Sequence, residues 1–409
     1  MIAPKLRFKA DDGSQFPDWE EKTLGDMTVE LQDYVPLSSG YPLMTSSRTG
    51  LMMQNEFRSK SSTDDSTAIF SVVPRGVATY RHMSDDDIFH FNINNLVDKG
   101  LVSKEYPVFN TKDNYNLYLL VEYLNSSRNF LNFCKAQKKG GTRTRLYFKV
   151  LKDFKLNMPS LPEQQKIVEF LSTIDTVIEK QKETVSAWEE RKKGVMQKLF
   201  NQEVRFKADD GSEFPEWEEK ILDEEGFFYG GLTGKNKDDF EKGSSKFITY
   251  MNVYKNTFAN QDMMGTVNVG ITEKQNKVLY GDILFAQSSE TVEEVGLSSV
   301  YLYDDEPYLN SFCMGFRFND LSNVCPKYMG YCMRSENIRK NIMLMGQGIS
   351  RINLGAKRLK TVSYKIPCLA EQQKIADCLS SLDEVIEKQR ATLAAWEEMK
   401  KGLLQQMFV

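Results

Sequence analysis

Two long stretches of the chain repeat apolar residues in alternating steps of four and three, at 161–200 and again at 369–408. A period close to 3.5 residues keeps one face of a helix against a partner along its whole length. The pattern therefore predicts two long helices. Their predicted seam positions are Ile167, Leu171, Ile174, Ile178, Gln181 and Trp188 in the first, and Ile375, Leu379, Leu382, Ile386, Gln389 and Trp396 in the second.

Helices of this length rarely stand alone on a protein surface. At 1.5 Å per residue each would be roughly 50–60 Å long. We expect the two to pair antiparallel as a coiled coil, with the seam glutamines specifying the register. Separate packing of each helix onto its own domain stays open. Ser160 and Glu163 predict a capping box at the start of the first helix, where the second copy has Cys368.

The two helical segments are copies of each other, identical at 24 of 40 positions with an offset of 208. A second phrase is also duplicated: RFKADDGSQFPDWEEK begins at Arg7 and RFKADDGSEFPEWEEK at Arg205. Solenoid repeats are far shorter, so this period indicates a tandem pair of whole units.

The duplication predicts an α+β fold, in which two globular α/β domains are separated by two long antiparallel coiled-coil helices with a pseudo-twofold internal repeat. The predicted boundaries are 1–156 for the first domain, 157–203 for the first helix, 204–364 for the second domain and 365–409 for the second helix.

The segments between the duplicated phrases show mixed secondary-structure signals. β-branched and aromatic runs bounded by turn residues predict strands, and longer apolar periodicity predicts helices. The expected strands lie within 69–82, 101–109, 278–286 and 297–303, and the expected helices within 118–133 and 326–343.

Each of these blocks ends in a basic, glycine-containing stretch, at 135–149 and 345–360, without acidic residues. Such a loop can approach a duplex and contact phosphates and base edges. Gly-x-x-Arg recurs in both, although an arginine that anchors the loop to the helix start is an equally open reading. The candidate DNA contacts are Lys138, Lys139, Thr142, Arg143, Arg145, Gln347, Ser350, Arg351, Lys357 and Arg358.

Composition predicts an ordinary soluble protein, with 41% hydrophobic residues and a mean hydropathy of −0.47. No apolar run is long enough for a membrane span, and the first residues do not resemble a signal peptide. Six scattered cysteines favour free thiols in a reducing cytoplasm. The net charge of −4 is not informative about the domains, because the acidic surplus lies chiefly in 201–220.

Catalytic motifs are not recognisable in this sequence. PDWEEK (17–22) places its acidic residues too close together for a metal-dependent nuclease, and YGGLTGKN (229–236) lacks the spacing of a phosphate-binding loop. Only two histidines are present, which disfavours zinc sites and histidine-based triads. We therefore expect no catalytic residue, no metal site and no cofactor in this chain.

The layout resembles the specificity subunit of a type I restriction–modification enzyme. The resemblance rests on the Trp-Glu-Glu-Lys entry into each block, on GLVSKEYPVF (100–109), on YGDIL (280–284), and on the P-x-L-x-EQQKI sequence that leads into each helix. It covers essentially the whole chain, although the first block has no clear counterpart of YGDIL.

The resemblance implies a non-catalytic subunit in which each domain reads one half of a bipartite, asymmetric site in double-stranded DNA. The helices would set the spacer and dock two modification subunits, which supply S-adenosylmethionine and adenine methylation. Restriction subunits would supply ATP- and Mg-dependent translocation and cleavage. Two other classes stay open: a coiled-coil scaffold or DNA-binding regulator, and a standalone enzyme. The target bases depend on loop geometry that this sequence does not reveal.

Overall fold

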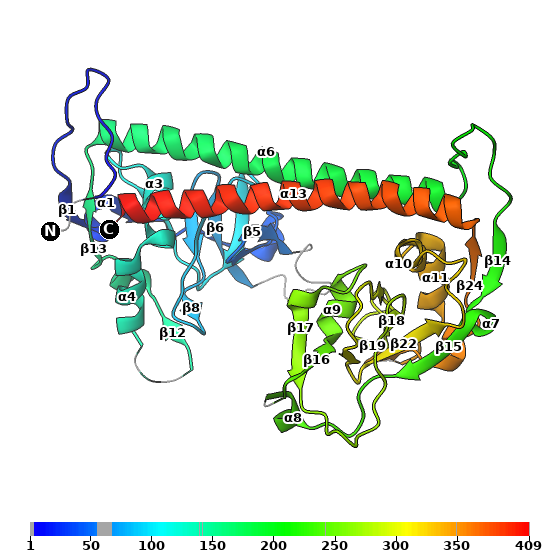
Figure 1. The fold of residues 1–409 in the computed structure, drawn as a ribbon. Helices are drawn as coiled ribbons and strands as arrows, with labels where there is room; N and C mark the ends of the chain where they lie inside the picture. The colour runs from blue at the N-terminus through cyan, green and yellow to red at the C-terminus, as the bar shows by residue number, and fades with distance from the viewer. Residues whose placement is uncertain are drawn as a thin grey trace. The chain divides into compact units, whose positions relative to one another are not determined.

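The computed structural model describes residues 4–54, 68–138, 140, 142–241, 243–348 and 350–408. The chain divides into two compact units: unit 1 contains 1–182 and 391–409, and unit 2 contains 183–390. Both long helices, α6 (Leu161–Phe200) and α13 (Leu369–Met407), belong partly to each unit (Figure 1). Each unit therefore holds the start of one long helix and the end of the other.

Unit 1 interleaves short strands with helices before α6 begins. Its elements are β1 (Glu20–Thr23), α1 (Leu24–Met27), β2 (Thr28–Glu30), β3 (Tyr34–Pro36), η1 (Leu37–Ser39), β4 (Met44–Ser47), β5 (Gly50–Met53), β6 (Ile69–Pro74), β7 (Ala78–Tyr80), β8 (Met83–Ser84), β9 (Phe91–Ile93), β10 (Lys99–Ser103), β11 (Val108–Thr111), α3 (Leu117–Ser126), α4 (Arg128–Ala136), β12 (Thr144–Arg145), α5 (Phe148–Leu151) and β13 (Lys155–Met158).

Unit 2 follows a similar order between the two long helices. Its elements are β14 (Glu218–Ile221), α7 (Leu222–Glu225), β15 (Gly226–Gly230), α8 (Lys237–Glu241), β16 (Ser245–Ile248), α9 (Tyr250–Lys255), η2 (Gln261–Met263), β17 (Met264–Val267), β18 (Ile283–Ala286), β19 (Ser288–Ser289), β20 (Ser298–Val300), β21 (Tyr308–Leu309), β22 (Cys313–Phe318), α10 (Pro326–Met333), α11 (Glu336–Leu344), β23 (Ile352–Asn353), α12 (Ala356–Leu359) and β24 (Ser363–Ile366).

The largest sheet has the same topology in both units. It is fully antiparallel, with strand order β2-β11-β7-β9 in unit 1 and β15-β22-β18-β20 in unit 2. The smaller sheets differ, because β10-β6-β3 is antiparallel whereas β17-β16-β21 contains a parallel pair. The predicted fold class, with two mixed α/β domains, two long helices and an internal repeat, is confirmed.

The shared topology identifies a positional equivalent of YGDIL in the first block, although the sequences share only the glycine there. Gly281 turns with φ +86° immediately before β18, and Gly76 turns with φ +75° immediately before the equivalent strand β7. In unit 2 the buried Asp282 accepts hydrogen bonds from Tyr229 at 2.6 Å and from Arg317 at 2.7 and 2.9 Å. Unit 1 has Val77 at this place, so the turn is retained without the buried carboxylate.

The stretches expected to be helical are helical, and each consists of two helices. The first breaks between α3 and α4 at Ser127, whose side chain accepts a hydrogen bond from the backbone of Phe130. The second breaks between α10 and α11 at Arg334 and Ser335.

All six cysteines are free, as predicted, and burial raises the pKa of Cys134 to about 12. Of the helices in the described ranges, none has the length and apolar content that crossing a bilayer would require.

The long helices run antiparallel within each unit, as their ion pairs show. In unit 1 Lys400 of α13 contacts Asp175 of α6 at 2.7 Å. In unit 2 the equivalent Lys192 of α6 contacts Asp383 of α13 at 2.5 Å. Both lysines occupy apolar steps of the heptad pattern, and their side chains are only 16% and 17% exposed. A buried lysine is costly without an ion-pair partner, so each lysine can lie in the seam only because the carboxylate is next to it.

These pairs also fasten the helices to the domain cores. Tyr118 of α3 donates a hydrogen bond to Asp175, and Tyr331 of α10 donates one to Asp383 at 2.7 Å. The apolar seam continues into the same cores. Ile167, Leu171, Leu404 and Met407 are buried in the core of unit 1, and Leu199, Ile375 and Leu379 in that of unit 2. At its ends the seam thus packs on a domain as well as on the partner helix.

A buried carboxylate at the start of each long helix binds the duplicated phrase. Glu163 is fully buried and accepts two hydrogen bonds from Arg7, at 2.9 and 3.1 Å, and one from Trp19 at 3.1 Å. Glu371 accepts the same three from Arg205, at 2.8 and 3.1 Å, and from Trp217 at 3.1 Å. We call each set of one glutamate, one arginine and one tryptophan a clamp. The hydrogen bond to the glutamate is the main cause of the raised pKa of each arginine.

The clamp shows that the predicted capping box is wrong. Glu163 is directed to Arg7 and Trp19, and the buried Ser160 hydroxyl has no hydrogen-bond partner within the described residues. The next residue, Gln164, connects the start of α6 to the domain. Its side-chain amide oxygen accepts a hydrogen bond from the backbone N–H of Asn116 at 2.9 Å, at the start of α3. Gln372 does the same at the start of α10, accepting from Cys325 at 2.8 Å.

Removing a clamp arginine would leave a fully buried carboxylate without its ion-pair partner. We expect Arg7→Ala to lower the free energy of unfolding by about 3–5 kcal/mol, as measured by chemical denaturation of the full chain. Arg205→Ala should do the same through unit 2. The matched control is Asp18→Ala, because Asp18 contacts Arg7 at 3.5 Å but is fully exposed. An Arg7→Ala protein as stable as this control would contradict the role of the clamp.

Candidate nucleic-acid interface

The two basic loops end on equivalent two-stranded ladders. In unit 1 β12 pairs with β8, with Thr144 opposite Ser84. In unit 2 β23 pairs with β19, with Ile352 opposite Ser289. Arg143 and Arg351 each directly precede the paired residue of their strand. The structure therefore places the two arginines at the same position of the repeated domain.

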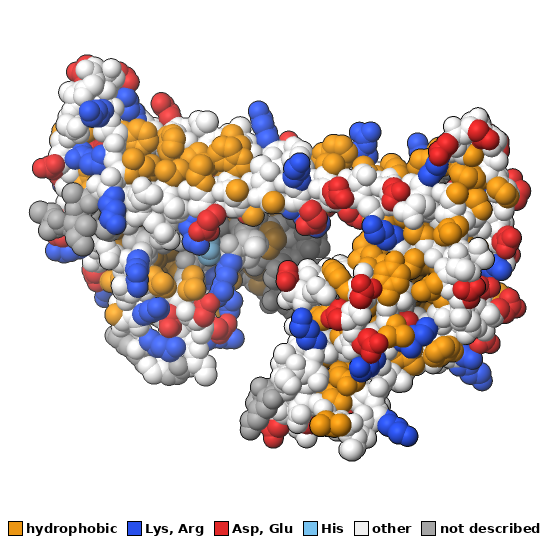
Figure 2. All heavy atoms as spheres, in the orientation of Figure 1, with side chains coloured by type: hydrophobic (Ala, Val, Ile, Leu, Met, Phe, Trp, Pro, Cys, Tyr) orange, Lys and Arg blue, Asp and Glu red, His pale blue; other side chains and the backbone are white. Residues whose placement is uncertain are grey.

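The arginine of unit 1 is engaged by a neighbouring acid. Arg143 donates to Asp85 at 2.7 Å, and both side chains are more than half exposed. Arg143 also lines a cavity of about 500 Å³ together with Thr142, Arg145 and Tyr147. Lys and Arg side chains gather over the α4–β12 end of this unit (Figure 2). This end offers positive charge to a phosphate backbone, with Arg143 partly neutralised.

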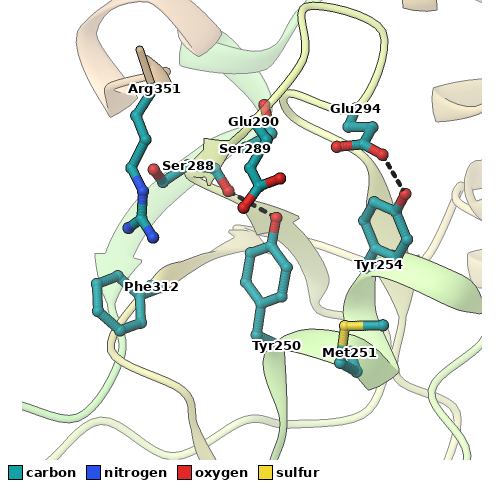
Figure 3. A pocket seen from close by; sticks show the side chains of 9 residues that line it. All are labelled: Tyr250, Met251, Tyr254, Ser288, Ser289, Glu290, Glu294, Phe312 and Arg351. Atoms are coloured by element: carbon teal, nitrogen blue, oxygen red, sulfur yellow. Dashed lines mark hydrogen bonds between the residues drawn. The ribbon is translucent and has the colours of Figure 1, made fainter. Parts of the chain in front are cut away.

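The arginine of unit 2 lines a different kind of cavity. Arg351 extends beside Phe312 at the edge of a cavity of about 510 Å³, whose other walls come from α9, β19 and the loop after β19 (Figure 3). Tyr250 of α9 donates to the Ser288 carbonyl at 2.6 Å, and Tyr254 donates to Glu294 at 2.5 Å. The Arg351 guanidinium has no hydrogen-bond or ion-pair partner in the part of the chain that is described.

The other predicted contacts fall into several groups. Thr142, Arg145, Ser350 and Lys357 are exposed. Lys138 lies 3.5 Å from Asp87. The backbone of Gln347 pairs with that of Asn353, and its side chain is exposed. Arg358 is half-buried and donates to the Met345 carbonyl at 2.6 Å, which indicates a structural role. Lys139 lies outside the described residues.

The alternative reading of the Gly-x-x-Arg loops, in which the arginine anchors the loop to the long helix, is not supported. Arg143 binds Asp85 rather than α6, and Arg351 contacts neither helix start by any hydrogen bond within the described ranges. Whether the predicted residues contact DNA stays a prediction.

Both loop glycines adopt backbone angles that favour glycine. Gly140 has φ +69° with open space around the position of a Cβ. Gly348 has φ +136°, and a Cβ there would lie 1.8 Å from the carbonyl oxygen of Arg351. In unit 2 the glycine therefore permits a close backbone approach that holds the loop around Arg351.

Acidic neighbours of these arginines were missed by the sequence reasoning. Asp85 follows β8 and Glu290 follows β19, each one residue after the strand position paired in the ladder. The repeat could not reveal them, because sequence similarity between the blocks fades upstream of the basic loops. Only the shared ladder shows that the two acids are equivalent.

A family description fits this arrangement. The model for "Type I restriction modification DNA specificity domain" matches residues 89–186 and 216–394, about two thirds of the chain. The chain belongs to this family. The matched segments include both basic loops, both ladder strands that follow them, and most of both long helices. The predicted family is therefore confirmed.

Specificity subunits of the family resemble the chain over different lengths. The type I restriction enzyme MjaVIII specificity subunit of Methanocaldococcus jannaschii is 24% identical over 284 residues, which cover 67% of this chain and 65% of that protein. A second protein of the same organism carries the name of a type I restriction enzyme MjaX specificity subunit. It is 22% identical and covers 97% of this chain and 94% of its own length.

One solved structure, from work on complex assembly and conformational transition of the type I R-M system, shares the fold. It has a TM-score of 0.53 at 15% identity and covers 96% of this chain and 98% of its own. At this identity the likeness concerns the fold alone.

The two loop glycines provide a matched pair of substitutions. Gly140→Ala should cost about 1–2 kcal/mol of strain and leave the loop in place, because its surroundings are open. Gly348→Ala should displace the Arg351 loop, because the added methyl group would overlap backbone atoms. Hydrogen exchange of residues 345–354 would show the difference. Equal protection in wild type and Gly348→Ala would contradict the close approach.

Proposed function

We propose that the chain is the non-catalytic DNA-specificity subunit of a type I restriction–modification complex. Each domain binds one half of a bipartite, asymmetric site in double-stranded DNA. Two modification subunits contribute S-adenosylmethionine and methyl transfer to adenine, and restriction subunits contribute ATP- and Mg-dependent translocation and cleavage. The expectation that the helices set the gap between half-sites stays a prediction.

The observation that carries this proposal is the equivalence of the two arginine loops. Both lie on the same ladder of the same fold, yet their surroundings differ in charge and shape. One scaffold with two different arginine-bearing loops suits recognition of two different half-sites. A scaffold that only joined other proteins would have no such requirement.

Two equivalent partners are supported by the surfaces beside the clamps. Leu161 and Leu369 occupy the same position, two residues before the clamp glutamates, and are 37% and 40% exposed. Single exposed apolar side chains are common on protein surfaces, but their repetition at duplicated positions suits contact with two copies of one partner. The start of each long helix thus both carries the clamp glutamate and repeats an exposed apolar position.

The first test is reconstitution. We expect the purified chain to show no methylation, ATP hydrolysis or DNA cleavage alone, and adenine methylation of one bipartite motif after modification subunits are added. Tritium transfer from S-adenosylmethionine and sequencing of the methylated DNA measure both. Methylation by the chain alone would favour the standalone enzyme, and an assembled complex without sequence-specific methylation would favour the scaffold.

The second test uses the pairing of the first and last strands of each domain. β14 pairs with β24 from Glu218–Ile366 to Ile221–Ser363, and β1 pairs with β13 in the same way. Exchange of residues 221–366 for the block of another family member should therefore replace one half-site and keep the other. The reciprocal exchange of residues 23–158 should change the opposite half-site. A change of both half-sites by one exchange would show that the domains do not read independently.

A further inference from the structure

The same pair of opposite charges occurs in both domains, closed in one and open in the other. Arg143 and Asp85 form an ion pair in unit 1. Their equivalents in unit 2, Arg351 and Glu290, line one cavity together. Within the described residues, neither the Arg351 guanidinium nor the Glu290 carboxylate has a hydrogen-bond or ion-pair partner. Two unpaired opposite charges on one cavity are an arrangement that a ligand with both acceptors and donors would complete.

The cavity that they line is held in shape by its other members. Figure 3 shows Arg351 and Glu290 on different segments that line the cavity, with Tyr250 below Glu290 and Phe312 below Arg351. Tyr250 and Tyr254 are fixed by the hydrogen bonds described above, and the second of these occupies Glu294. Glu290 is therefore the acidic residue of the cavity whose carboxylate is available.

The loop that carries Glu290 is anchored to helix α11 by hydrogen bonds. Arg339 of α11 donates to the backbone carbonyls of Glu293 at 2.9 Å and Val295 at 2.8 Å. Gly296 closes the loop with φ +64°, where a Cβ would meet Ile342 at 2.5 Å. The backbone bearing the acid is thus tied to the helix that precedes the arginine loop.

We infer that Arg351 and Glu290 together read one G·C base pair in the half-site bound by unit 2. Arg351 donates to the O6 and N7 atoms of guanine, and Glu290 accepts from the N4 amino group of cytosine. These are the major-groove atoms that the two side chains complement, and they lie on the same base pair. The inference rests on the proposed function and specifies which side chains confer part of its specificity.

An exposed carboxylate at this place is informative because DNA is negatively charged. The carboxylate repels phosphates, which weakens the binding of DNA in general. Only a sequence that places an exocyclic amino group beside the carboxylate compensates for this repulsion. Glu290 therefore penalises wrong bases as well as favouring the right one. In unit 1 Asp85 already binds Arg143, so Arg143 must leave its partner before it can reach a base.

The experiment uses the complex assembled with modification subunits and the motif found by methylation sequencing. We expect Arg351→Ala and Glu290→Gln to relax the same G·C pair of one half-site, by roughly 5- to 150-fold in relative methylation rate against duplexes carrying the other pairs. Recognition of the other half-site should not change. Glu293→Gln is the matched control, because Glu293 is exposed on the same loop but does not line the cavity, and it should leave that G·C pair as specific as in the wild type.

A second measurement tests the contact itself. Replacing the guanine by 7-deazaguanine removes the N7 acceptor, which should weaken binding of the wild-type complex in a fluorescence anisotropy assay and have little effect on Arg351→Ala. Arg351→Lys keeps the charge but replaces the rigid planar donor pair by a flexible ammonium group, so it should also relax the motif, by less than Arg351→Ala. Thermal melting establishes that each variant is folded.

Several outcomes would overturn the inference. Folded variants that keep full discrimination at every position would do so, as would relaxation of an A·T pair, or of different pairs by the two substitutions. If these occur while the wild-type complex methylates a bipartite motif, the proposed function stands and only the assignment of Arg351 and Glu290 fails. A wild-type complex without a bipartite motif would overturn both.

Discussion

A fully buried carboxylate at the start of each long helix is the interaction on which the rest of the structure depends. Glu163 and Glu371 would be costly to bury without partners, and each is matched by one arginine and one tryptophan from the duplicated phrase. This requirement explains why the phrase is written twice. Each long helix needs its own arginine and tryptophan. The first strand of each domain, β1 or β14, begins directly after that tryptophan, so the clamp also fixes where the domain starts.

The seam lysines extend this attachment along the helices. Lys192 and Lys400 each join a carboxylate on the opposite helix, and that carboxylate also receives a tyrosine hydroxyl from the domain. In unit 1 Lys400 contacts a further acid, Glu122, whose pKa is raised chiefly by burial. The polar members of the seam therefore specify which helix faces which, and they couple that choice to the position of the domain.

The domains combine this common frame with divergent outer loops. The four-stranded sheet, its glycine turn and the paired entry strands are shared, whereas the smaller sheets and the cavity walls differ. The framework residues are held by burial and hydrogen bonds, so they cannot vary freely without loss of stability. The exposed loop charges carry no such constraint. Membership of the specificity-domain family is consistent with this division, because recognition can change in the loops while the attachment is kept.

The sequence by itself determined the tandem repeat, the two long helices, the mixed character of the blocks and the family, because these are expressed in local periodicity and in identical phrases. The tertiary structure alone decided the partners of Glu163, the correspondence of Gly76 with Gly281, and that of Asp85 with Glu290. Those relations join residues far apart in the chain, or residues in blocks whose sequences have diverged. A local pattern can show that Glu163 begins a helix, but only the folded chain brings Arg7 and Trp19 to it, and long-range contacts of this kind leave no periodic trace.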